Sequence, residues 1–140
     1  MFMKKLFTFL ILTFSLFTIN SNAVAENLEE NDKILKIGVL LPLSGKHKET
    51  GQSFLKAVQL ALYDIDNKNI KIYPKDNKSD ALNTYLSAKE FEEMGIKIVV
   101  GPIFHENLER LNELNNITFI SLTNHNQKIP KNTIAFGINI

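Results

Sequence analysis

The sequence predicts an α/β domain built on a parallel β-sheet, and three observations support this fold class. Apolar runs of strand length alternate along the chain with longer segments of helical period, which is the pattern of βαβ crossovers. The first run, Ile37–Leu41, is continuously apolar, as expected for a strand buried on both faces. Glycine and proline punctuate the runs, at Pro42 and at Gly101-Pro102. A length of 140 residues allows one ordinary domain.

The first helix and the second strand follow directly after this run. Residues 51–67 are predicted to form the helix, because their apolar residues recur at helical spacing. Residues 70–75 alternate as a strand, but Pro74 cannot donate to a ladder, so we expect this strand at a sheet edge. The helical stripe consists of Phe54, Val58, Ala61, Leu62 and Ile65.

The remaining elements repeat the alternation. A second helix is capped by Ser79-Asp80, runs to Met94 and ends at Gly95. Residues 96–100, 117–122 and 133–138 are the third, fourth and fifth predicted strands, and a polar loop over residues 124–132 precedes the last of them. We expect Leu82, Tyr85, Leu86 and Phe91 on the inward face of the second helix, and Leu108, Leu111 and Leu114 on one side of a short third helix.

The first 25 residues predict a secretory signal peptide. Lys4 and Lys5 precede the charge-free apolar run Leu6–Ile19, and Ala23-Val24-Ala25 is a small-x-small cleavage site. The run is shorter than the roughly 20 apolar residues of a spanning helix, so we expect cleavage after Ala25 and a periplasmic product. Residues 26–34 are a polar leader, and residues 35–140 form the domain.

Composition excludes several classes of function. The sequence has 16 Lys and Arg and 15 Asp and Glu, which gives a formal net charge of +1. A nucleic-acid-binding protein needs a larger excess of basic residues. Because the chain contains no cysteine, it has no disulfides, no thiolate metal ligands, no thiol nucleophile and no lipid-bearing cysteine.

No motif for a cofactor or for covalent catalysis is present. Ser44-Gly45-Lys46 follows a strand, but its glycine spacing is wrong for a phosphate-binding loop, and His47 stands where serine or threonine is required. The sequence contains neither Gly-x-Gly-x-x-Gly nor Gly-x-Ser-x-Gly. We therefore predict a protein that is not an enzyme and has no cofactor.

Polar residues gather in the four loops expected at the carboxyl edge of the sheet, where open α/β sheets bind their ligands. These loops are residues 42–51, 76–79, 102–107 and 123–126. They form either a polar crevice that faces a ligand or a second lobe, or ordinary loops that cap helices. The candidate residues are Ser44, Asp76, His105, Glu106, Asn107, Thr123 and Asn124.

Three of the loops carry a histidine, which raises the question of a metal site. His47, His105 and His125 could join Asp76 around a cation, since imidazole is a common zinc ligand. Their spacings match no local metal motif. We therefore predict solvated loop histidines and no metal.

Two separated motifs resemble the type I periplasmic binding proteins, the leucine/isoleucine/valine-binding-protein family. The motifs are residues 37–45 (IGVLLPLSG) with Gly51-Gln52, and residues 99–102 (VVGP), followed by the strand at 117–122. The resemblance covers about residues 35–140. It implies the first lobe of a two-lobed, non-enzymatic receptor, with helices on both faces of a sheet in the order 2-1-3-4-5. Since no helix is predicted to cover the last strand, we expect the sequence to be part of a longer lobe, without the second lobe and hinge.

The loop after Gly101-Pro102 separates two branches of this family. Amino-acid receptors have small hydroxyl residues there, which hold the ligand's α-carboxylate, but this loop has none, and Glu106 would oppose a carboxylate. Phe104 followed by Glu106-Asn107 resembles the periplasmic activators of penicillin-binding proteins, which adds Phe104 to the candidates. The resemblance implies an activator of peptidoglycan synthesis with a penicillin-binding protein as partner. The alternative is the substrate-binding protein of an ABC importer, with an amino acid or similar solute and a permease as partners.

Overall fold

The computed structural model describes residues 34–125 and 127–137. The predicted signal peptide, its cleavage site and nearly all of the polar leader lie outside the described residues. Within the described part of the chain, no helix has the length and apolar character needed to cross a membrane.

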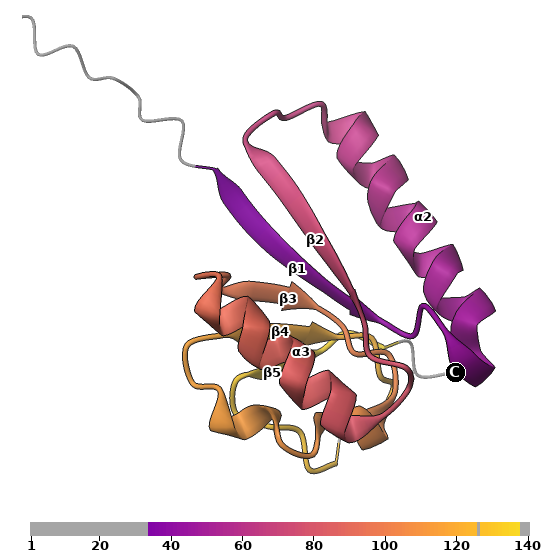
Figure 1. The fold of residues 1–140 in the computed structure, drawn as a ribbon, viewed down its shortest axis with the longest axis vertical. Helices are drawn as coiled ribbons and strands as arrows, with labels where there is room; N and C mark the ends of the chain where they lie inside the picture. Colours follow the sequence, from indigo (N-terminus) through magenta and orange to yellow (C-terminus); the bar gives the residue numbers. More distant parts are fainter. Residues whose placement is uncertain (1–33, 126, 138–140) are drawn as a thin grey trace, which may run out of the picture. The chain divides into compact units, whose positions relative to one another are not determined.

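Five parallel strands form one sheet in the order β2-β1-β3-β4-β5 (Figure 1). The predicted fold class and strand order are therefore confirmed. Pro74 pairs with Val39 in the outermost position of the order, so the prediction of an edge strand is also confirmed. The strands are β1 (Leu35–Leu41), β2 (Ile70–Asp76), β3 (Ile98–Val100), β4 (Thr118–Ser121) and β5 (Thr133–Ala135).

Helices α2 (Lys48–Ile65) and α3 (Ala81–Glu93) lie on opposite sides of the sheet (Figure 1). The short helix predicted around residues 108–114 is instead two 3₁₀ segments, η2 (His105–Leu108) and η3 (Leu111–Glu113). Arg110 leaves the helical region, with φ −112° and ψ 4°, and this separates the two segments. A further 3₁₀ turn, η1 (Gly45–His47), precedes α2.

The face of the sheet beneath α3 carries the closed core. Phe91 of α3 packs with strand residues such as Val99 and Phe119, all fully buried. Gly38 allows this approach, because a Cβ there would lie 2.9 Å from the Phe91 ring. The leucines predicted on one side of the third helical segment are indeed buried: Leu108, Leu111 and Leu114.

The predicted inward face of α3 is partly wrong. Leu82 and Leu86 are exposed at 54% and 48%, whereas Thr84, Ala88 and Phe91 are buried. Leucines on one side and small residues on the other both fit a helical period, and the small side lets the helix lie closer to the sheet. The predicted cap is confirmed, since Asp80 accepts a hydrogen bond of 2.7 Å from the backbone of Asn83.

The opposite face of the sheet is apolar but incompletely covered. Val39 and Leu41 are fully buried in β1. Ile134 and Phe136, at and just after β5, are exposed at 57% and 75%, although Ile134 pairs with Ile120 of the neighbouring strand. The described structure is therefore open on this face near β5, and the open area reaches the carboxyl edge of the sheet.

Candidate functional site

The first two loops at the carboxyl edge are bound together by one carboxylate. Asp76, the last residue of β2, accepts hydrogen bonds through Oδ1 from the backbone of Leu43 (2.8 Å), Ser44 (3.3 Å) and Lys78 (2.8 Å). Its Oδ2 accepts a short bond from the Ser44 hydroxyl. We refer to these four residues as the Asp76 clamp. The Asp76 and Ser44 side chains are thus engaged with each other and with the backbone.

These hydrogen bonds set the pKa of Asp76. Burial acts to raise the pKa of this carboxyl. The hydrogen bonds from the Ser44 hydroxyl and from the backbone of Lys78, Leu43 and Ser44 favour the ionised form and together outweigh burial, so the pKa is lowered from 3.8. The group is an ionised acceptor at neutral pH.

The loops after β3 and β4 are bound to each other through backbone and buried hydroxyl groups. The Pro102 carbonyl accepts hydrogen bonds from the Leu122 backbone (3.1 Å) and the Ser121 hydroxyl (2.8 Å). Buried Thr123 accepts a bond of 3.1 Å from the backbone N–H of His125. Gly101, where the loop after β3 begins, has a φ of +108° and lies against β1, since a Cβ there would lie 2.1 Å from the Leu40 carbonyl oxygen.

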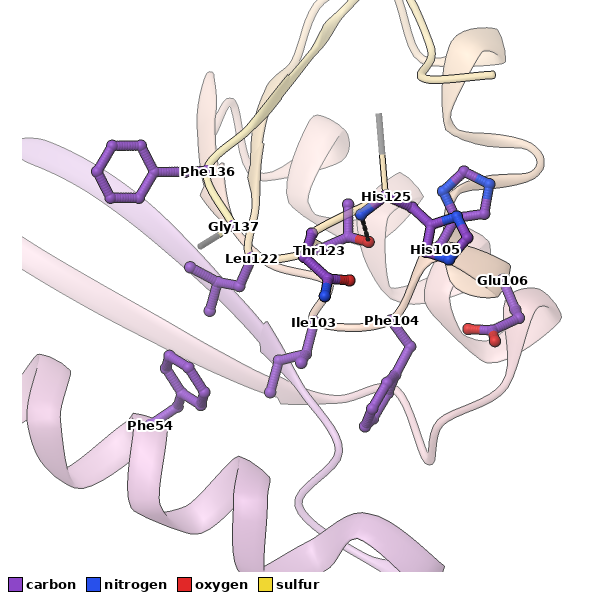
Figure 2. Close-up of a pocket in the computed structure, with 11 residues that line it drawn as sticks. Phe54, Ile103, Phe104, His105, Glu106, Leu122, Thr123, His125, Phe136 and Gly137 are labelled. Carbon is purple, nitrogen blue, oxygen red and sulfur yellow. Dashed lines mark hydrogen bonds between the residues drawn. The ribbon is translucent and has the colours of Figure 1, made fainter. Parts of the chain in front are cut away.

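A pocket of about 570 Å³ lies beside these two loops, and we call it the rim pocket. Figure 2 shows Phe54 of α2 projecting toward Ile103, with Phe136 beyond Leu122 and with His105 and His125 on the other side. One part of the lining is therefore apolar and the other carries imidazoles and Glu106. The lining residues are Phe54, Ile103, Phe104, His105, Glu106, Leu122, Thr123, Asn124, His125, Phe136 and Gly137.

The structure places two of the eight candidate residues in the clamp, five in the pocket lining and one in neither. Ser44 and Asp76 belong to the Asp76 clamp and do not line the rim pocket. Asn107 is 3% exposed, lies outside the lining, and its Nδ2 has no hydrogen-bond partner among the described residues. The five candidates that do line it are Phe104, His105, Glu106, Thr123 and Asn124.

Sequence reasoning missed part of the apolar lining. Phe54 was assigned only to a helical stripe, although it lies one turn after Gly51 and hence near the edge where ligands bind. Phe136 was predicted to lie inside the fifth strand, residues 133–138, but β5 ends at Ala135, so Phe136 instead follows the carboxyl end of the strand and lines the pocket. Ile103 and Leu122 flank candidates in the same two loops.

The lining carries little charge. Glu106 is the one carboxylate among the lining residues, and none of them is lysine or arginine. His47 packs on Phe104 with ring centres 4.4 Å apart, and His105 packs on His125 at 5.1 Å. Over the described residues, no three histidine, aspartate or glutamate side chains meet in a way that could hold a metal ion. The arrangement is suited to non-covalent binding of a group with an apolar body.

No protein-family model and no curated protein matches the sequence. Solved structures match its fold. LivJ, a branched-chain amino acid substrate-binding protein from Streptococcus pneumoniae, is 24% identical with TM-score 0.58, covering 68% of this chain and 30% of that protein. The C-domain of LpoA from Haemophilus influenzae, a regulator of PBP1A, is 22% identical with TM-score 0.62, covering 74% and 33%.

A third structure, an ABC-type branched-chain amino acid transporter protein from Rhodopseudomonas palustris, is 19% identical with TM-score 0.64, covering 75% and 33%. The chain thus spans about a third of the length of each of these three structures. They have the type I periplasmic binding protein fold, so the fold that the sequence motifs implied is confirmed.

Proposed function

We propose that this chain is part of an exported, non-enzymatic binding protein that docks a penicillin-binding protein through the rim pocket and thereby regulates peptidoglycan synthesis. The lining of the pocket carries the proposal. Phe54, Phe104 and Phe136 offer an apolar surface, and Glu106 is the charged group beside it. Such a surface accepts an apolar side chain presented by a partner, with a basic neighbour positioned near Glu106.

The solute receptor is the second candidate, and the size of the pocket favours it. A volume of about 570 Å³ is typical of sites for small molecules. The Thr123 hydroxyl and the two imidazoles could orient a polar group of such a ligand. LivJ and LpoA share the fold, so the fold agrees with both candidates.

The charge of the pocket lining is the reason that we place the penicillin-binding-protein partner before the solute receptor. A free amino acid brings a carboxylate, which requires donors or a cation, and the lining contains no lysine or arginine. Glu106 would repel that carboxylate. The two candidates in the first two loops, Ser44 and Asp76, are also unavailable, because they are bound to each other in the clamp.

Binding measurements on the full-length exported protein test the proposal. We expect it to bind an immobilised penicillin-binding protein, and Phe104→Asp to weaken binding at least tenfold. Tyr63→Asp is the matched control, because Tyr63 is an aromatic residue on α2 that is 81% exposed and outside the pocket lining. Equal losses in both variants would contradict docking at the pocket.

Calorimetry against leucine, isoleucine and valine tests the second candidate. Micromolar or tighter binding of any of them would make the solute receptor the first choice. Export has its own test, since N-terminal sequencing of the periplasmic product should begin at Glu26. An intact Met1 on periplasmic material would contradict cleavage after Ala25.

A further inference from the structure

Two imidazoles meet at the rim pocket, where the sequence analysis predicted separate solvated histidines and no metal. His105 opens η2 in the loop after β3, and His125 lies in the loop after β4. Their ring centres are 5.1 Å apart and their planes are inclined by 32°. The loops that carry them are joined at the Pro102 carbonyl, so this spacing is a property of adjacent strands rather than of two independent loops.

The ring nitrogens of this pair lack partners within the described part of the chain. Neither imidazole makes a side-chain hydrogen bond there, and Nδ1 of His105 is shielded from solvent without any partner. A buried polar atom of this kind requires an explanation, such as a bound ion. A neutral imidazole nitrogen is a common ligand of divalent transition metals.

We propose that His105 and His125 together chelate a divalent transition-metal ion, such as Zn²⁺, at the rim pocket. Zinc–nitrogen bonds of about 2.0–2.1 Å and a tetrahedral angle place the centres of two imidazole rings roughly 5.2 Å apart. The observed 5.1 Å agrees with this spacing. Two protein ligands leave the remaining positions open to water or to donor atoms of a bound molecule.

The local charge favours a cation at this place. Glu106 follows His105 directly and also lines the pocket, and no lysine or arginine is among the lining residues. His47 provides a contrast within the same edge of the sheet, because its ring packs on Phe104 rather than on another imidazole. This proposal rests on the histidine pair and is independent of the partner proposed above.

Zinc titration of the full-length exported protein against a chromophoric indicator tests the pair. We expect one equivalent to bind, and His105→Gln and His125→Gln each to lower the affinity at least tenfold. His47→Gln is the matched control and should retain the wild-type affinity. Comparable denaturation curves for all variants would show that a loss of binding does not reflect unfolding.

A spectroscopic measurement identifies the ligands directly. Substoichiometric Cu²⁺ should broaden the imidazole NMR signals of His105 and His125 and leave that of His47 sharp. The proposal is overturned if the wild type binds zinc no more tightly than the His105→Gln/His125→Gln double variant. It is also overturned if His47→Gln loses as much affinity as the other two single variants.

Discussion

The two halves of the carboxyl edge use their polar groups in opposite ways. In the half formed by the loops after β1 and β2, Asp76 accepts four hydrogen bonds, and its partners all belong to those loops. In the half formed by the loops after β3 and β4, buried groups join the backbones, and the side chains of Phe104, His105 and Glu106 line a pocket. A polar residue at this edge therefore indicates function only when its hydrogen bonds are not already satisfied by the protein.

The largest effect is expected at Gly51, where α2 meets the loop after β1. A Cβ on Gly51 would lie 2.0 Å from the carbonyl oxygen of Pro42, which belongs to the backbone and cannot rotate away. Gly51→Ala should therefore lower the free energy of unfolding by about 3 kcal/mol. Chemical denaturation measures this change. Ser53→Ala, on the exposed side of the same helix, should stay within about 0.5 kcal/mol, and a similar loss in both variants would contradict the close contact.

The next largest effect is expected at the Asp76 clamp. Asp76→Asn removes the charge that strengthens the hydrogen bonds from Ser44, Leu43 and Lys78, and one amide hydrogen then faces donors. The free energy of unfolding at pH 7 should fall by about 2 kcal/mol. Glu106→Gln makes the same chemical change in the other half of the edge, where no hydrogen bond among the described residues depends on the carboxylate, and it should change stability by less than about 0.5 kcal/mol. Equal effects would show that the two halves do not differ.

The clamp also predicts a dependence of stability on pH. Because the pKa of Asp76 is lowered from 3.8, the unfolded chain takes up the proton first as the solution is acidified. The stabilisation by Asp76 should be fully present above pH 3.8 and should disappear as the pH falls through the lowered pKa. Denaturation of the wild type and Asp76→Asn at a series of pH values measures it. Their difference should be constant at neutral pH and shrink in acid, and a difference that grew in acid would contradict the lowered pKa.

The topology was predictable because local signals determine it. Pro74 excludes a central strand, the Ile37–Leu41 run requires cover on both faces, and Asp80 caps α3, so short stretches of sequence carry this information. The inward face of α3 was predicted wrongly, because Leu82 and Leu86 satisfy the same helical period as Thr84 and Ala88. The choice between the two sides depends on how closely the sheet approaches the helix, which only the tertiary structure determines.

The candidate site was predictable only as a set of loops. The rule for strand carboxyl ends led to Glu106 and Thr123, and the family resemblance added Phe104; all three do line the rim pocket. The rule could not distinguish the pocket residues from Asp76, because the sequence does not show whether a carboxylate already accepts hydrogen bonds from the protein, as that of Asp76 does. The contact between His105 and His125 depends on the paths of two loops, for which the sequence contains no periodic signal.

The smallest effect on stability, and the sharpest test of the open half of the edge, is expected for Glu106→Ser. Since Glu106 is exposed and no described hydrogen bond involves its side chain, the free energy of unfolding should stay within about 0.5 kcal/mol of the wild type. The substitution removes a charge that repels carboxylates and adds a hydroxyl donor at the pocket, so binding of leucine, isoleucine or valine should become measurable by calorimetry. Glu106→Ala removes the charge without adding the donor, and it should bind these amino acids more weakly than Glu106→Ser. If neither variant binds them, Glu106 is not what excludes free amino acids, and the preference for a protein partner would have to rest on the aromatic lining of Phe54, Phe104 and Phe136.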